Sequence, residues 1–225
     1  MLIFQVLELI YEASRRIKRH FYPIEYKAVI FDLDQVFLRV DEKDDLVDLM
    51  KLVSRDQYLS RIYLDYELGK MSFSAFFDCL KVYFPGKTKH LSWQEVRQKT
   101  LGQKDPKIAN LIEKLREHNL KIGLLTNIGF GTDAKDVTDT PTEVNDVFDV
   151  VVESCREGVR KPNHRTYEIT AFRLGVFPHE CIYIDDLMRN CRGAELVGMK
   201  SFHLGNGNVL RLLDDLQTFL GVPLL

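Results

Sequence analysis

The stretch from Ala28 to Phe37 constrains the fold of this 225-residue chain more than any other segment. It opens as an uninterrupted apolar run, which predicts a strand buried on both faces, as in a parallel sheet. Two carboxylates, Asp32 and Asp34, follow at the end of that run, two residues apart. Because side chains alternate along an extended segment, this spacing places both carboxylates on one side. Ligands bind at the carboxyl ends of strands in open parallel sheets, so we expect a site here.

The second half of the chain alternates apolar runs with helical patterns. Further buried strands are predicted at residues 121–126, 147–153, 181–186 and 200–204. Helical segments precede, separate and follow these strands, and the Asp105-Pro106 pair is a good start for the first of them. Alternation of this kind is typical of an α/β fold. We therefore expect a Rossmann-like parallel sheet with helices on both faces.

The segment between the first two strands contains no buried-strand pattern and is helical instead. Apolar residues recur there at spacings of three and four, and such stripes must be buried against one another. We expect an α/β core of residues 26–38 and 104–225, with residues 39–103 forming an inserted α-helical cap. A bundle inserted directly after the first strand would lie over the strand ends, exclude water and select substrate. A helical decoration without a gating role is the alternative.

Residues 1–25 predict a separate amphipathic helix with a basic end, Arg15 to His20. Glu8 interrupts its apolar residues and no small-residue cleavage site follows, so a secretory signal is not indicated. We expect this helix to pack on the domain or on a second copy of the chain, which would make a homodimer. A helix that lies on a membrane surface is the alternative.

Composition excludes several classes of protein. The net charge of −2 provides no basic footprint for nucleic acid. No segment approaches the roughly 20 apolar residues of a membrane span. The four cysteines are far apart and form no C-x-x-C pair, which favours reduced thiols and a cytoplasmic protein.

Polar residues at strand ends, or in a loop beside them, form the candidate site. They are Asp32 with Asp34, Thr126 with Asn127, Lys161, and Asp185 with Asp186. If the carboxylates converge, each pair of like charges near 4 Å costs on the order of 4 kcal/mol at an effective dielectric of 20. One lysine cannot offset this repulsion, whereas Mg²⁺ can, and it prefers oxygen ligands. The absence of His and Cys from these positions argues against zinc.

This set of groups is suited to a phosphoryl group. A cation and a lysine neutralise phosphoryl oxygens, and hydroxyl and amide groups donate hydrogen bonds to them. A carboxylate can also act as the nucleophile and form an aspartyl phosphate.

The ordered motifs resemble those of the haloacid dehalogenase superfamily of phosphohydrolases. The motifs are Phe-Asp32-Leu-Asp34, Leu-Leu-Thr126-Asn127, Arg160-Lys161-Pro162, and Ile-Asp185-Asp186 with Asn190. The resemblance covers about residues 26–220, including the helical insertion. The later part is similar to the phosphatase domain attached to soluble epoxide hydrolases and to related domains fused to acyl-CoA dehydrogenases.

The resemblance implies a role for each matching residue. Asp32 would attack phosphorus, and Asp34 would protonate the leaving alcohol and then activate the hydrolytic water. Thr126 and Asn127 would bind the phosphoryl oxygens, while Lys161 would hold those oxygens and the nucleophile.

The resemblance also implies a metal site. Mg²⁺ would take carboxylates from Asp32 and Asp186 and the carbonyl of Asp34, with help from Asp185. Asn190 would orient the last motif. The expected activity is Mg²⁺-dependent hydrolysis of a small phosphorylated metabolite.

One departure from the family pattern leaves alternatives open. Gln35 replaces the glycine that usually follows the second aspartate, where glycine gives the backbone freedom. A catalytically weak module that binds a phosphorylated ligand or a partner protein is therefore an alternative, as is a phosphomutase. A 2-haloacid dehalogenase would use the same nucleophile on carbon, but the presence of Asp34 favours the phosphatase.

Overall fold

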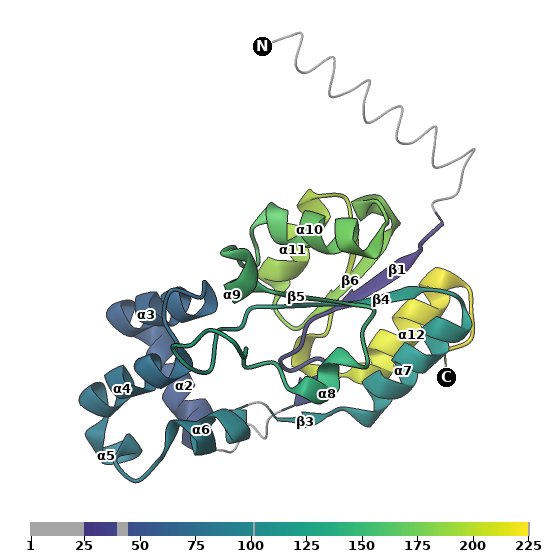
Figure 1. Ribbon diagram of the computed structural model, residues 1–225. Coiled ribbons are helices and arrows are strands. Elements are labelled where there is room, and N and C mark those ends of the chain that lie inside the picture. The colour runs from purple at the N-terminus through teal and green to yellow at the C-terminus, as the bar shows by residue number, and fades with distance from the viewer. Residues whose placement is uncertain (1–24, 40–44, 101, 225) are drawn as a thin grey trace, which may run out of the picture.

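The computed structural model describes residues 25–39, 45–100 and 102–224. Its centre is a five-stranded sheet with the order β5-β4-β1-β6-β7, and every neighbouring pair is parallel (Figure 1). The strands are β1 (Ala28–Phe31), β4 (Lys121–Thr126), β5 (Val150–Glu153), β6 (Cys181–Asp185) and β7 (Lys200–His203). The predicted Rossmann-like α/β fold is confirmed. The helix predicted for residues 1–25 lies outside the described residues, apart from its last position.

Helices cover both faces of this sheet (Figure 1). Ala28 and Ile30 of β1 pack in one apolar cluster with α10 (His164–Leu174) and α11 (Met188–Leu196). Val29 and Phe31 pack in the other cluster with α7 (Pro106–Glu117) and α12 (Val209–Leu220). All four side chains of β1 are fully buried. Burial of a valine, isoleucine or phenylalanine side chain stabilises the fold by about 1.5–3 kcal/mol, which explains why the strand is apolar throughout.

Local sequence determines where α7 begins. The carboxylate of Asp105 accepts hydrogen bonds from the backbone N–H groups of Lys107 at 2.8 Å and Ile108 at 3.3 Å. Pro106 follows at the first helical position, where its missing N–H leaves no bond unmade. The predicted Asp105-Pro106 start is therefore present in the structure.

A second group of helices lies between β1 and α7. They are α2 (Asp45–Arg55), α3 (Gln57–Glu67), α4 (Phe73–Tyr83), α5 (Pro85–Thr88) and α6 (Trp93–Thr100). Their buried side chains form a separate apolar cluster that includes Leu49, Leu59, Phe76 and Phe77. Two short antiparallel strands, β2 (Leu38–Arg39) and β3 (Gln103–Lys104), pair where the chain leaves and re-enters the core. Sequence patterns did not predict these strands, because two residues show no periodicity.

The segment after β4 connects the core to these helices. The sequence predicts a loop at residues 129–145, whereas the structure ends this loop with a short helix, α8 (Thr142–Asn145). Phe130 forms isolated bridges with Ser72 and Thr138, and the Phe73 N–H donates to the Phe130 carbonyl at 2.7 Å. The loop is therefore an ordered contact surface for the start of α4.

The remaining elements are short. They are α9 (Ser154–Glu157) and two 3₁₀ turns, Pro178–Glu180 and Gly205–Gly207. The third core strand begins at Val150, three residues after the predicted position, and just before it the Asp149 carboxylate accepts the Ile122 N–H at 2.7 Å. None of the helices in the described part of the chain has both the length and the apolar character that a membrane span requires.

Candidate active site

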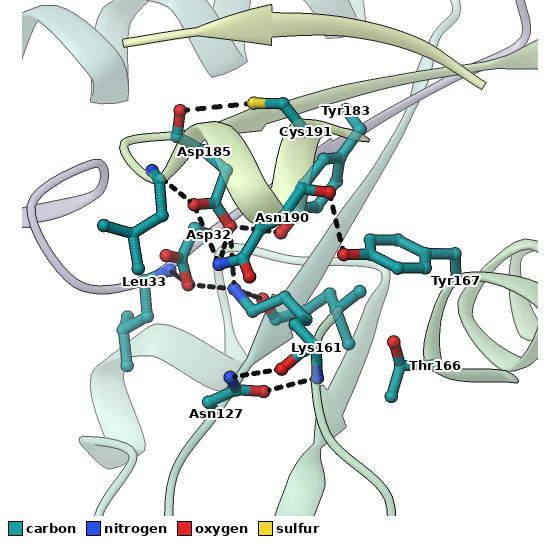
Figure 2. A network of polar contacts seen from close by, with 12 residues as sticks. Asp32, Leu33, Asn127, Lys161, Thr166, Tyr167, Tyr183, Asp185, Asn190 and Cys191 are labelled. Atoms are coloured by element: carbon teal, nitrogen blue, oxygen red, sulfur yellow. Dashed lines mark hydrogen bonds and ion pairs between the residues drawn. The ribbon is translucent and has the colours of Figure 1, made fainter. Parts of the chain in front are cut away.

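Lys161 lies at the centre of the candidate site and is only 1% exposed. Its ammonium nitrogen contacts Asp32 Oδ1 at 2.6 Å, the Leu125 carbonyl at 2.9 Å and Asp185 Oδ2 at 3.0 Å (Figure 2). Burial alone would lower the pKa of Lys161, but the two carboxylates outweigh it and raise the pKa to about 12. Lys161 is therefore a permanent positive charge between the ends of β1 and β6.

Asp32 follows β1 directly and is also buried. Its Oδ1 accepts hydrogen bonds from the Leu33 N–H at 2.7 Å and from Lys161. No described residue donates to Oδ2. Burial is the main reason that the pKa of Asp32 lies well above its usual range, although Lys161 acts in the opposite direction. One oxygen of this carboxylate is thus held in place, and the other is available for chemistry.

Three carboxylates form a group that fits a metal ion. Asp32, Asp185 and Asp186 each offer an oxygen, and these atoms lie within 4.8 Å of one another. Burial, followed by the charge of Asp185, raises the pKa of Asp186 to about 6. A divalent cation would remove this penalty, and an all-oxygen donor set is the one that Mg²⁺ prefers. The predicted carboxylates therefore converge, with Asp34 contributing no carboxylate to this group.

The Asp34 side chain is exposed to solvent. Its pKa is nevertheless raised to about 6. Desolvation by the surrounding protein is the largest cause; Lys161 opposes it, and Asp186 and Asp185 add to it. A side chain can keep solvent-exposed atoms while the protein atoms packed around its carboxylate remove much of its hydration. Asp34 can therefore both hold and release a proton near neutral pH.

Thr126 is the last residue of β4, and Asn127 follows it at the same edge of the sheet. The Thr126 side chain is fully buried, and its hydroxyl has no hydrogen-bond partner among the described residues. Asn127 accepts the Lys161 N–H at 2.8 Å and donates to the Lys161 carbonyl at 3.2 Å. The Thr126 hydroxyl is thus an unused donor at the site, whereas the Asn127 amide holds the backbone of Lys161.

Asp185 is surrounded by donors. Asn190, from α11, donates to both of its oxygens at 3.0 Å, and the Leu187 N–H donates to Oδ1 at 2.8 Å. Tyr183 donates its hydroxyl to Oδ2. Sequence reasoning missed Tyr183, although its position two residues before Asp185 in the same strand was the available signal.

Contacts from the inserted helices also reach this edge and were not predicted. Glu67, at the end of α3, forms an ion pair with Arg160 at 2.7 Å, directly beside Lys161 in the chain. The Ser154 hydroxyl donates to the Glu67 carbonyl at 2.6 Å. Because both pairs join segments far apart in the chain, no local pattern could have indicated them.

His203 is a second residue that sequence reasoning missed. Its Nε2 lies 2.8 Å from the carbonyl of Asp186. The register of β6 and β7 places His203 opposite Asp185, which explains this contact. A histidine at the end of the last predicted strand was the only signal in the sequence.

The parallel sheet and the carboxylate group with its buried lysine define a class of enzyme. A sequence model of the haloacid dehalogenase-like hydrolase family matches residues 26–198 of this chain. The chain therefore belongs to the haloacid dehalogenase-like hydrolases, and the resemblance inferred from its motifs is confirmed.

Two curated proteins and one solved structure are similar to this chain. The chain is 32% identical to the acyl-CoA dehydrogenase family member 10 of Mus musculus over 119 residues, 53% of this chain but only 11% of the mouse protein. It is 27% identical to the sesquiterpene phosphatase astK of Aspergillus oryzae over 80% of this chain and 90% of that protein. A haloacid dehalogenase family enzyme of Bacteroides thetaiotaomicron, solved as a magnesium complex, shares the fold. Its TM-score is 0.62 at 22% identity, over 81% of this chain and 95% of that chain.

Proposed function

We propose that the protein is a Mg²⁺-dependent phosphohydrolase that acts on a small phosphorylated metabolite through a phosphoaspartate at Asp32. One observation carries this proposal: Lys161 is buried against Asp32, in a cluster of carboxylates at the strand edge where Thr126 keeps an unpartnered hydroxyl. Such a site can neutralise and hold a phosphoryl group. The similarity to a phosphatase from Aspergillus oryzae over most of both chains supports the same activity.

The first half-reaction transfers the phosphoryl group to the enzyme. Oδ2 of Asp32 attacks phosphorus while Oδ1 stays hydrogen bonded to Leu33 and Lys161. The bond between phosphorus and the alcohol oxygen breaks, and Asp34 gives its proton to that oxygen. Lys161 and the Thr126 hydroxyl hold the phosphoryl oxygens during the transfer.

The second half-reaction releases inorganic phosphate. Asp34, now a carboxylate, takes a proton from a water molecule, and the water oxygen attacks phosphorus. The bond between phosphorus and Asp32 breaks and restores the free carboxylate. A pKa of about 6 lets Asp34 serve as acid and then as base near neutral pH.

The carboxylates of Asp32 and Asp186, with Asp185 and the Asp34 carbonyl, would hold Mg²⁺. The bound ion would neutralise charge on the phosphoryl group. These residues fit a divalent cation because three of their carboxylate oxygens already lie close together. The raised pKa of Asp186 reflects the burial and the like charge that a cation would relieve.

The helices within residues 39–103 would act as a cap over residues 26–38 and 104–225. Glu67 brings the end of α3 beside Arg160 and Lys161, which supports a role in excluding water from the intermediate. The described cysteines form no disulfide and three are buried, which favours a reducing compartment such as the cytoplasm. A homodimer through residues 1–25 stays a prediction.

The proposal is tested by turnover of p-nitrophenyl phosphate and of a panel of phosphorylated metabolites. We expect hydrolysis with Mg²⁺, a loss of at least about 10³-fold in Asp32→Asn because the nucleophile is removed, and a loss in excess EDTA. Asp214→Asn, an exposed aspartate on α12, is the matched control and should retain full activity. Failure of the wild type on every phosphate ester would favour the binding module, and equal turnover in EDTA would remove Mg²⁺ from the proposal.

A further inference from the structure

We propose that Tyr183 is a positioning residue that sets how Lys161 is shared between Asp32 and Asp185. The inference rests on the proposed phosphohydrolase function, because it assigns Lys161 to the phosphoryl group. It starts from a buried phenol for which the reaction steps above have no use.

The position of Tyr183 follows from strand geometry. Tyr183 and Asp185 lie two residues apart in β6, so their side chains point to the same face of the sheet, and both are fully buried. The Tyr183 hydroxyl donates to Asp185 Oδ2, the same oxygen that Lys161 Nζ approaches at 3.0 Å (Figure 2). The Asn190 amide also donates to this oxygen at 3.0 Å, so three donors compete for it, and Tyr183 is the one that shares its strand.

The competition has a direction. Lys161 Nζ lies closer to Asp32 Oδ1, at 2.6 Å, than to Asp185 Oδ2, at 3.0 Å. A hydroxyl that donates to Oδ2 uses one of its lone pairs and withdraws part of its charge, which weakens its attraction for the ammonium. Without that hydroxyl, Lys161 would be drawn toward Asp185 and away from the nucleophile. Tyr183 therefore keeps the lysine on the side where phosphoryl charge develops.

The tyrosine itself is held rigidly. Its ring packs edge-on against Tyr167, with centroids 5.2 Å apart and planes at 86°. Lys161 Nζ lies 5.8 Å from the centroid of the Tyr183 ring. Tyr183→Phe keeps the ring and both of these contacts, so it isolates the effect of the hydroxyl.

The chain provides a matched control. Tyr167 is also fully buried, and its hydroxyl donates to the backbone carbonyl of Asn190 at 2.8 Å. Tyr167→Phe therefore removes one buried phenol hydroxyl and one hydrogen bond, as Tyr183→Phe does, but not one that reaches Lys161. If the hydroxyl has only a structural role, activity should fall equally in both variants. If Tyr183 positions Lys161, activity should fall only in Tyr183→Phe.

The experiment measures kcat and KM for p-nitrophenyl phosphate at saturating Mg²⁺, and the affinity for inorganic phosphate from its stabilisation of the protein against heat. A hydrogen bond to a charged group is worth enough that Tyr183→Phe should lower kcat about tenfold or more. It should weaken phosphate binding several-fold, on the same scale. Tyr167→Phe should stay within about twofold on both measures, even with a similar loss in Tm.

Each outcome decides the proposal. Equal losses in the two variants, or a Tyr183→Phe enzyme within twofold of wild type, would overturn it. A wild type that binds phosphate with Mg²⁺ but hydrolyses no ester would defeat the proposed function alone, because phosphate affinity still tests the position of Lys161. A wild type that binds no phosphate overturns both. If Tyr183→Phe does not fold, Tyr183→Met removes the same hydroxyl with a side chain that adapts to the space, and the same changes are expected.

Discussion

Gln35 lies in a backbone conformation that usually requires glycine. Its φ is +58°, in the left-handed region that costs most residues about 1–2 kcal/mol. The turn is tight there, because the N–H groups of Phe37 and Leu38 both donate to the Leu33 carbonyl, at 3.0 and 2.8 Å. The glycine usual in this family therefore has a physical reason, and this chain tolerates a strained residue between its motif and β2.

Substitutions at Gln35 should rank by their tolerance of positive φ. Gln35→Gly should unfold at the wild-type denaturant midpoint or above it, because the relief of strain offsets the added freedom of the unfolded chain. The free energy of unfolding of Gln35→Val should be lower than that of wild type by about 1 kcal/mol or more, because β-branched residues are the least tolerant of positive φ. Urea denaturation measures all three proteins, and a Val variant as stable as the Gly variant would contradict the strain.

The hydroxyl of Thr126 should matter for function and not for stability. Because it has no partner among the described residues, Thr126→Val loses no hydrogen bond and should keep or slightly raise the free energy of unfolding. Its kcat for an aryl phosphate should fall on the order of 10²-fold, as when a donor to a reacting oxygen is removed.

Thr170→Val is the control for this prediction. The Thr170 hydroxyl is equally buried but donates to the Thr166 carbonyl at 2.7 Å, away from the site. Thr170→Val should therefore have a lower free energy of unfolding than wild type and an unchanged kcat. The opposite pattern in the two variants would remove Thr126 from the phosphoryl site.

At the residue scale, sequence indicated those groups whose position depends on one strand. The sequence predicts that Asp32, Asp185 and Asp186 lie at strand ends, because a buried apolar strand leads directly to Asp32 and another leads directly to Asp185 and Asp186. The sequence does not predict the pairing of Asn127 with the Lys161 backbone, because these residues are distant in the chain. It also does not predict that Tyr183 donates to Asp185, because several donors compete for that carboxylate.

At the scale of elements, Glu67 joins α3 to the core. Burial raises its pKa to about 7, although Arg160 acts against this. The unfolded chain therefore releases this proton at lower pH than the folded protein does. As pH rises from about 4.5 to 7, the free energy of unfolding falls, by on the order of 3 kcal/mol from this group.

Glu67→Gln should remove this pH dependence. The free energy of unfolding of the variant, relative to wild type, should rise as pH increases through the same window, whatever the constant cost of losing the ion pair with Arg160. Denaturation in EDTA at a series of pH values measures the difference. Glu113→Gln, an exposed glutamate on α7, controls for the substitution itself. A flat difference for Glu67→Gln would show that this carboxylate is not buried with a raised pKa.

The helices themselves were the most predictable elements. Apolar residues at spacings of three and four predict helices over residues 44–53, 58–68 and 73–82, within a few residues of the observed bounds of α2, α3 and α4. Their contact with the core was not predictable, because Tyr66 reaches Asp139 and Phe73 reaches Phe130 only after both segments fold. The short strands β2 and β3 are defined by pairing alone.

At the scale of the whole molecule, the chain brings the carboxyl ends of β1, β4 and β6 side by side at one edge of the sheet. Alternating strands and helices predicted a parallel sheet, but not the order in which the strands lie. The order places β1 between β4 and β6, so that the residues after these three strands meet. This convergence is what crowds the carboxylates of Asp32, Asp185 and Asp186 around Lys161.

The most direct measurement is mass spectrometry of enzyme quenched in acid during turnover of p-nitrophenyl phosphate with Mg²⁺. We predict the added mass of one phosphoryl group on the peptide that contains Asp32, and none on that peptide from Asp32→Asn. Steady hydrolysis by a wild-type enzyme that never carries phosphorus on Asp32, or full activity in Asp32→Asn, would contradict the account.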